Sequence, residues 1–282
     1  MTESPYPHLS DIGFQRMMPS TALRPYIQWY WSVQSDGRVT TPREEFMHPD
    51  GSLGLVFNWG DKLDLSQGSY AQTVTIDQVS SQSRRLKLEG VVEAFGILFQ
   101  PGGAYPLFGV PLNELVDTAV LSAHFRSNQL HHLHEQLANA PSFLQKVGLV
   151  ETWLNYRLQQ LCNPSPVIKP SLALIAQSQG QILIQAVAEA VHMSPRQLER
   201  LYNSQVGLSP KRFARMMRIR QTREALRQIE TRSLTDIAHT YGFYDQPHFI
   251  REFKSVVGLT PGAYSLRQQQ KKTTVTHQGD QG

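Results

Sequence analysis

Residues 236–261 read DIAHTYGFYDQPHFIREFKSVVGLTP, and residues 188–210 carry a related stretch, AEAVHMSPRQLERLYNSQVGLSP. The two copies are 51 residues apart at Arg200 and Arg251, and 50 apart at their first alanines, so the second copy has one inserted residue in its turn. Each copy has the pattern of a helix, a tight turn and a second helix. This repeat predicts two tandem helix-turn-helix units.

The residues at the turns and helix starts favour the same interpretation. Gly242 can adopt the positive φ that such a turn often requires, and His192 stands at that position in the first copy. Ser194 precedes a proline, as an N-cap before the N1 position does, and Asp245 is the expected N-cap of the last long helix. Between the units, residues 211–228 contain no helix breaker, and a helix there with its flanks would span about 33 Å. That length is close to one turn of DNA, about 34 Å.

The charge is unevenly distributed along the chain. Residues 1–179 hold 12 Lys/Arg and 15 Asp/Glu, a balance of −3, whereas residues 180–272 hold 15 and 7, a balance of +8. A basic region beside a mildly acidic one is typical of a nucleic-acid-binding module joined to another domain.

Residues 180–268 resemble the two-unit DNA-binding domain of the AraC/XylS transcription regulators. The most specific part is the series DIA, YGF, HF, REFK and GLTP between Asp236 and Pro261. The resemblance covers about a third of the chain. It implies a sequence-specific regulator that binds double-stranded DNA, with the second helix of each unit in a major groove, and that contacts RNA polymerase if it is an activator.

The resemblance also implies roles for individual side chains. Base contacts are expected from Arg196, Glu199, Arg200, Gln246, His248 and Arg251. Their chemistry fits, since Arg can bind guanine, Gln adenine and Glu cytosine. Phosphate contacts are expected from Ser194, Ser209, Lys211, Arg212, Lys254 and Thr260. Pro247 departs from the polar residue frequent in the family and removes one possible base contact. For any single arginine, the alternative is a solvated or internally paired charge.

The N-terminal region has a different pattern. Short aromatic and β-branched runs from Arg24 to Leu107, separated by turn signals at 35–37, 49–51 and 100–103, predict a barrel or sandwich of strands. After about Asn128 the apolar period becomes helical, and the stripe over 143–161 predicts a helix that either packs on the barrel or forms a homodimer interface. The predicted class is therefore α+β, with a β-rich N-terminal domain and an all-α C-terminal domain.

Proline and polar segments predict the domain limits. Three prolines within residues 163–170 predict a linker. We therefore expect a first domain over 1–162, a DNA-binding domain over 171–268, and a polar, disordered tail over 269–282.

The N-terminal region resembles the cupin-like sensor and dimerisation half of the same family, in a subgroup without a generally assigned ligand. Residues 93–103 (EAFGILFQPGG), residues 107–115 and the HPDG sequence at 48–51 carry this resemblance. A small effector would fit the mouth of a barrel. Candidate effector contacts are Trp29, Trp31, Phe57 and Trp59. Strand alternation puts Trp29 and Trp31 on one face and Tyr30 on the other. Two alternatives stay open: these aromatics are core, or this domain is only a dimerisation or protein-interaction module.

An enzyme is the remote alternative. Catalytic cupins hold a metal with clustered histidines, but the strand region offers His48 alone. Further potential metal ligands fall in a helical stretch: His131, His132, His134 and Glu135. Cys162 is the only cysteine, which excludes a disulfide framework, a Cys-rich zinc site and a DNA-repair methyl acceptor. We predict no catalytic residues, metal or cofactor.

Composition narrows the class further. The chain is 40% hydrophobic and 18% charged, enough apolar side chain for folded cores. The longest apolar stretch, residues 91–110, is interrupted by polar residues, proline and glycine, and the N-terminus lacks the features of a secretory signal. These features predict a cytoplasmic protein with no membrane partner.

Overall fold

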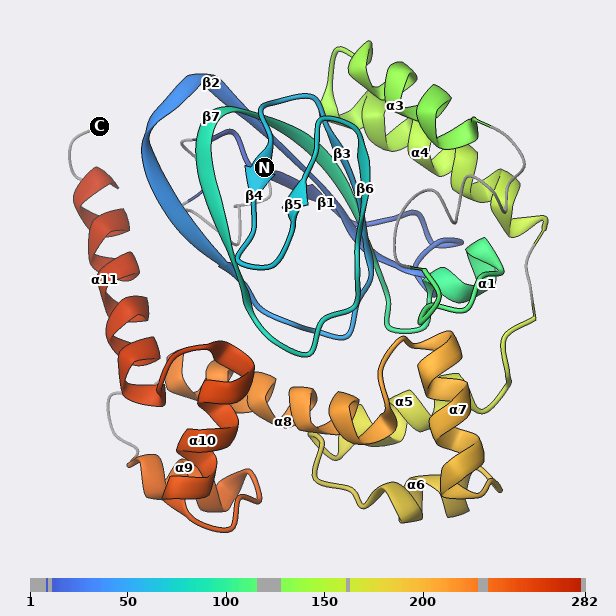
Figure 1. Ribbon diagram of the computed structural model, residues 1–282, viewed down its shortest axis with the longest axis vertical. Helices are drawn as coiled ribbons and strands as arrows, with labels where there is room; N and C mark the ends of the chain where they lie inside the picture. Colours follow the sequence, from blue (N-terminus) through green and yellow to red (C-terminus); the bar gives the residue numbers. More distant parts are fainter. Residues whose placement is uncertain (1–8, 10–11, 116–127, 161–162, 228–232, 280–282) are drawn as a thin grey trace.

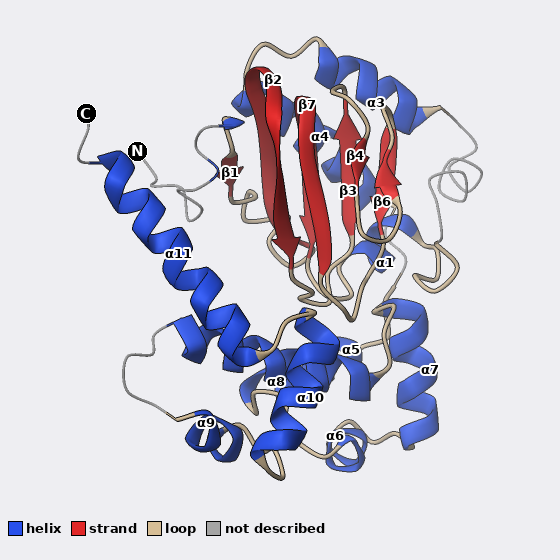
Figure 2. Cartoon of the chain, turned by 60° about the vertical axis from the view of Figure 1, so that its left-hand side comes forward, coloured by secondary structure: helices blue, strands red, loops and turns tan. Residues whose placement is uncertain are grey.

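The computed structural model describes residues 9, 12–115, 128–160, 163–227 and 233–279 (Figure 1). Its N-terminal domain is a curved antiparallel sheet covered on one side by helices, and its C-terminal domain is helical (Figure 2). The predicted α+β class is confirmed. No helix within the described residues is long and apolar enough to span a bilayer.

The sheet has the strand order β1-β2-β7-β3-β6, with every pair antiparallel. The strands are β1 (Gln15–Met17), β2 (Ile27–Met47), β3 (Gly54–Asn58), β4 (Leu63–Asp64), β5 (Ser69–Tyr70), β6 (Val74–Asp77) and β7 (Arg84–Phe99). β4 and β5 form a separate hairpin, which a bridge from Leu65 to Leu86 joins to β7. The expected barrel-like unit is thus an open, curved sheet with β1 and β6 as its edges among the described residues.

One predicted turn is wrong. The signal at residues 35–37 lies inside β2, which pairs with β7 from Ile27–Phe99 to Met47–Arg84. The register shifts between Gln34 and Arg38, and Gly37 has a φ of 84°. The turn residues form a β-bulge instead, because the partner strand continues past them.

The helices of the N-terminal domain cover one face of the sheet. They are α1 (Ala104–Phe108), α3 (Gln129–Ala138) and α4 (Phe143–Leu158). α4 buries Val147, Val150 and Leu154 in the same core as Phe57 and Phe95. The apolar stripe expected over 143–161 therefore packs on the sheet. The homodimer through this helix stays a prediction.

The C-terminal domain is built on one central helix, α8. Its helices are α5 (Ile168–Gln177), α6 (Ile184–Ala190), α7 (Pro195–Gln205), α8 (Pro210–Arg227), α9 (Leu234–Thr240), α10 (Gln246–Val257) and α11 (Pro261–Gly279). α8 contributes Phe213 and Met217 to the core of the first unit, and Ile219 and Leu226 to that of the second. The two tandem units are thus confirmed, each with its own core.

Two expected boundaries need correction. α5 begins at Ile168, so the last three residues of the expected linker are helical; Pro170 falls in the first turn, where a missing N–H costs nothing. The tail expected to be disordered over 269–282 is helical as far as Gly279. Gln and Lys are good helix formers, and no proline or glycine interrupts residues 263–278.

Candidate nucleic-acid interface and interdomain cavity

The first helix-turn-helix unit consists of α6 and α7. Ser194 caps α7 by accepting from the Gln197 N–H at 3.3 Å, and the Gln197 side chain accepts from the Ser194 N–H at 3.0 Å. His192 makes the turn with a φ of 55°. On the buried side of α7, Tyr202 donates to Ser171 Oγ at 3.1 Å, and burial raises the pKa of Tyr202 to about 12. The capping box fixes where α7 begins, and the buried tyrosine fixes which side of the helix faces the core.

The expected base-contacting residues of the first unit lie on the exposed side of α7. Arg196, Glu199 and Arg200 are all exposed, whereas Leu198 and Tyr202 on the other side of the helix are fully buried, as expected. Within the described part of the chain, none of the three exposed side chains has a hydrogen bond or ion pair. α7 therefore presents three unengaged polar side chains on one surface.

The second unit consists of α9 and α10, and its turn uses Gly242 with a φ of 70°. Asp245 caps α10, as expected, by accepting from the His248 N–H at 2.6 Å. Gln246 Oε1 accepts from the Thr235 hydroxyl at 2.8 Å, and His248 Nδ1 accepts from the Tyr244 N–H at 3.3 Å. Two of the three expected base-contacting residues are thus held by their own unit.

Arg251 is the exception in the second unit. Its side chain is exposed and has no hydrogen bond or ion pair among the described residues. It occupies the position in α10 that Arg200 occupies in α7. The two arginines are therefore the equivalent, unengaged positive charges of the two units.

The expected phosphate contacts fall into two groups. Ser194, Ser209 and Thr260 each accept at 3.3 Å from an N–H in the first turn of the helix that follows. The positively charged candidates are all exposed and without an ion pair among the described residues: Lys211, Arg212 and Lys254. Helix starts and free cations are the groups that bind DNA phosphates.

Sequence reasoning missed Arg218, one of the residues that join the two units. From α8, its guanidinium donates to the Gly242 carbonyl at 3.4 Å and to the Gly180 carbonyl at 3.2 Å. It also lies 5.4 Å from the centre of the Phe243 ring. Its position midway along the central helix is the sequence feature that could have identified it. Arg218 ties the turn of the second unit to the first.

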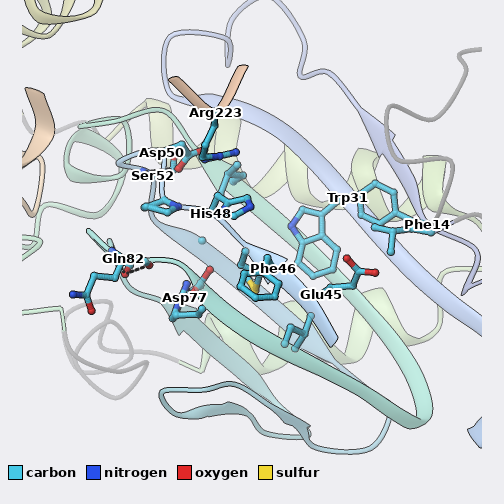
Figure 3. Close-up of a pocket in the computed structure, with 18 of the residues that line it drawn as sticks. Phe14, Trp31, Glu45, Phe46, His48, Asp50, Ser52, Asp77, Gln82 and Arg223 are labelled. Carbon is cyan, nitrogen blue, oxygen red and sulfur yellow. Dashed lines mark hydrogen bonds and ion pairs between the residues drawn. The ribbon is translucent and has the colours of Figure 1, made fainter. Parts of the chain in front are cut away.

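A cavity of about 870 Å³ lies between the uncovered face of the sheet and the helices α8 and α11 (Figure 3). Trp29 and Trp31 line it, whereas Tyr30 is buried on the opposite face, as strand alternation predicts. Phe57 and Trp59 do not line it. Both belong to the core under α3 and α4, since neighbouring Val56 takes the cavity side of β3. Two of the four expected effector contacts therefore line this cavity, and the other two lie in the core on the opposite face of the sheet.

Polar groups in the cavity wall are mostly paired. Asp77 and Arg84 form an ion pair; burial raises the pKa of Asp77, and Arg84 opposes that rise. Arg220 pairs with Glu224 at 3.3 Å. His48 Nδ1 lies 2.8 Å from the Ser83 hydroxyl. The cavity wall therefore combines apolar stretches with polar side chains that these contacts hold in place.

The two domains contact each other at several places, at the cavity and away from it. Arg267 of α11 donates to the Glu44 carbonyl at 2.9 Å, and the Leu112 N–H donates to the Ser204 carbonyl of α7 at 2.7 Å. Gly51, with a φ of 82°, lies so close to Phe213 of α8 that an added Cβ would be 2.7 Å from the ring. A side chain at residue 51 would therefore require Phe213 or the backbone of residue 51 to shift.

The described residues contain no group of three potential metal ligands. His131 lies 3.5 Å from Glu135, and His134 stacks on Trp59 with its Nε2 3.2 Å from the Asn58 carbonyl. Cys162 lies outside the described residues.

Two domain families match the chain. Residues 187–267 match a helix-turn-helix domain, which spans both units. Residues 15–121 match a domain of unknown function, DUF6597, which spans the sheet and α1.

Individual proteins match over different shares of the chain. The transcriptional activator RhaS of Escherichia coli (strain SE11) is 40% identical over 76 residues, which are 27% of each chain. The chain thus covers about a quarter of the length of the curated relatives it matches. Among solved structures, the C-terminal domain of AraT, a response regulator from Geobacillus stearothermophilus, is 26% identical with a TM-score of 0.35, over 38% of this chain and 88% of that one. ToxT from Vibrio cholerae is 11% identical with a TM-score of 0.45, over 90% of this chain and 98% of that one.

Proposed function

We propose that the chain is a sequence-specific DNA-binding transcriptional regulator of the AraC/XylS family. The observation that carries this proposal is the placement of Arg200 and Arg251. They are equivalent, exposed side chains on the second helices of two units built on one central helix, and neither has a hydrogen bond or ion pair with the described residues. Such helices can enter successive major grooves on one face of a duplex.

In this proposal, the side chains of the two second helices have different tasks. Arg196, Glu199 and Arg200 read bases in one groove, and Arg251 reads them in the next, with Gln246 and His248 available after local rearrangement. Lys211, Arg212 and Lys254 bind phosphates together with the capped helix starts, and so fix the position of the protein on DNA. The protein acts in the cytoplasm, without enzymatic activity of its own.

The N-terminal domain is proposed to sense a small molecule. The support is the interdomain cavity, since its lining residues come from the sheet and from α8 of the DNA-binding domain. A ligand there would favour one arrangement of the two domains. If no small molecule occupies it, the domain serves only for dimerisation or protein interaction.

The test of DNA recognition is selection of binding sites from a random duplex library by the full chain, at about 150 mM salt so that non-specific binding is weakened. We expect enrichment of a bipartite sequence whose halves are centred about one helical turn apart. Binding without enrichment, with a steep salt dependence, would contradict the proposal.

A further inference from the structure

We propose that Glu114, a residue of the N-terminal domain, opposes DNA binding by the first unit because its carboxylate lies beside the path of the DNA backbone along α7. The inference rests on the proposed function, since it names a further residue that sets the affinity of the same DNA-binding surface. That residue lies outside the helical domain that carries both units.

A groove of about 850 Å³ lies between α7 and residues 111–114, a segment that follows α1 in the N-terminal domain. The groove runs along the exposed side of α7, from the N-cap Ser194 to Ser204. Its lining includes the three expected base-contacting side chains of the first unit and two exposed side chains of the N-terminal segment: Arg196, Glu199, Arg200, Asn113 and Glu114. The N-terminal domain therefore lies beside the surface by which α7 would read bases.

Leu112 holds the segment against α7. Its N–H donates to the Ser204 carbonyl at 2.7 Å, and a Cβ added to Gly207, just beyond α7, would lie 3.4 Å from the Leu112 Cβ. The side chains of Leu112 and Leu115 are both buried in the core of the N-terminal domain. The two residues between these leucines are exposed and thus have a fixed place beside α7.

The carboxylate of Glu114 is unengaged in this arrangement. The backbone of the residue closes a turn, since its N–H donates to the Pro111 carbonyl at 2.9 Å. The carboxylate itself forms no hydrogen bond or ion pair within the described part of the chain. Its charge therefore has no partner there that it would lose on meeting DNA.

Glu114 cancels the positive charge of the groove. Among the α7 residues that line it, Arg196 and Arg200 outweigh Glu199 by one positive charge. Glu114 adds one negative charge, so the lining as a whole is neutral. DNA phosphates are attracted by unpaired cations and repelled by a carboxylate. The N-terminal segment therefore weakens the electrostatic attraction between α7 and DNA.

The dimensions of DNA bring a phosphate backbone close to this carboxylate. A major groove is about 12 Å wide, and a helix with its side chains is about 10–12 Å across. A helix that enters such a groove therefore has a phosphate backbone along each flank. Because residues 111–114 lie along one flank of the exposed side of α7, a backbone there comes close to Glu114. Removing the charge, or moving the segment away from α7, should strengthen DNA binding.

The segment of the N-terminal domain that contacts the end of α10 carries no such charge. The Ser83 N–H donates to the Val256 carbonyl at 2.7 Å, one residue beyond the position equivalent to Ser204. Residues 78–83 contain no charged side chain. The N-terminal domain thus holds the two units through similar backbone hydrogen bonds, but Glu114 should act only on the half of the DNA site that α7 occupies.

Fluorescence anisotropy with the full chain and a duplex obtained by site selection measures the effect of the charge. At about 150 mM salt, Glu114→Gln should bind about threefold more tightly and Asn113→Asp about threefold more weakly, as expected for one exposed charge. Glu114→Gln should also steepen the slope of log affinity against log salt by up to about 1. Unchanged or weaker binding by Glu114→Gln would overturn the proposal.

Asp36→Asn is the matched control. It removes one exposed carboxylate from the same domain at a position that does not line the groove, so this variant should bind DNA like the natural protein. An equal gain in Asp36→Asn would make the effect one of net charge and overturn the proposal. Thermal unfolding should give Glu114→Gln the Tm of the natural protein. A lowered Tm would attribute the gain to loosened domain contacts and would also overturn it.

A shortened duplex locates the effect. A duplex that ends before the half read by α7 has no phosphates near Glu114, so the natural protein and Glu114→Gln should bind it equally. A gain that persists on the shortened duplex would overturn the proposal.

Site selection and random duplexes separate this inference from the proposed function. If no sequence is enriched, the regulator proposal fails, whereas the affinity of Glu114→Gln for a random duplex still decides the role of the carboxylate. If a bipartite sequence is enriched and Glu114→Gln binds it like the natural protein, the regulator proposal stands and this inference fails.

Discussion

The two helix-turn-helix units have the same backbone fold but present different side chains on their surfaces. Both turns use a residue with positive φ, His192 at 55° in the first unit and Gly242 at 70° in the second. In the first unit, all three expected base-contacting side chains are unengaged among the described residues, whereas in the second only Arg251 is. A repeated fold therefore does not imply a repeated reading surface, and we expect the first unit to supply more of the sequence preference.

Because each unit has its own core, each can be destabilised separately. Substitutions in these cores should have the largest effect on stability. Leu198 and Phe253 are fully buried in the first and second core. Leu198→Ala should cost about 2–5 kcal/mol and Phe253→Ala about 3–5 kcal/mol of unfolding free energy. Denaturant titration measures the cost, and hydrogen exchange shows where it falls. Loss of protection in α7 and α10 alike, whichever core is changed, would show that the units are not independent.

Removing the equivalent arginines should have the next largest effect. Arg200→Ala and Arg251→Ala should each cost about 1–3 kcal/mol in binding a selected duplex, and relax the preference at one base position. Fluorescence anisotropy on specific and random duplexes measures both. Equal losses on the two duplexes would exclude base reading by that arginine.

Substitution of the residue with positive φ should change the stability of the protein in opposite directions at the two turns. His192→Gly should stabilise the protein by up to about 1 kcal/mol, because a residue with a side chain pays a steric cost at positive φ that glycine avoids. Gly242→Ala should destabilise it by about 1–2 kcal/mol, since the added Cβ would also lie 2.9 Å from the Gln181 side chain. Thermal unfolding of the two variants checks the signs. Two changes of the same sign would mean that the turns are not equivalent.

The smallest effect is expected at a phosphate contact. Lys254→Ala should weaken binding to all duplexes alike and reduce the slope of log affinity against log salt by about 1. Titrations at several salt concentrations measure this. A change in base preference would place Lys254 among the base contacts instead.

The C-terminal domain could be predicted closely because its determinants are local. Caps such as Ser194 and Asp245, and the repeat itself, can be identified without tertiary contacts, and the structure has both caps in place. The sequence pattern could not predict which residues of distant segments bond to each other. Thr235 holds Gln246, and Arg218 joins the two units, through contacts that no spacing in the chain specifies.

The N-terminal domain was less predictable for the same reason. The direction of Trp29 and Trp31 followed from alternation along one strand, but Phe57 and Trp59 needed the face of β3, which depends on its pairing with β7. The turn expected at 35–37 became a bulge because β7 continues opposite it. The contribution of α8 to the cavity could not be predicted, since this helix approaches the sheet only in the folded chain.

The central claim is that two units on one helix read two adjacent grooves, and parallel site selection tests it most directly. The natural protein, Arg200→Ala and Arg251→Ala would each be given the same random duplex library. The account predicts a bipartite sequence for the natural protein, with halves about one helical turn apart, and each variant losing preference in a different half. An undivided sequence weakened in the same way by both variants, or no enrichment at all, would contradict it.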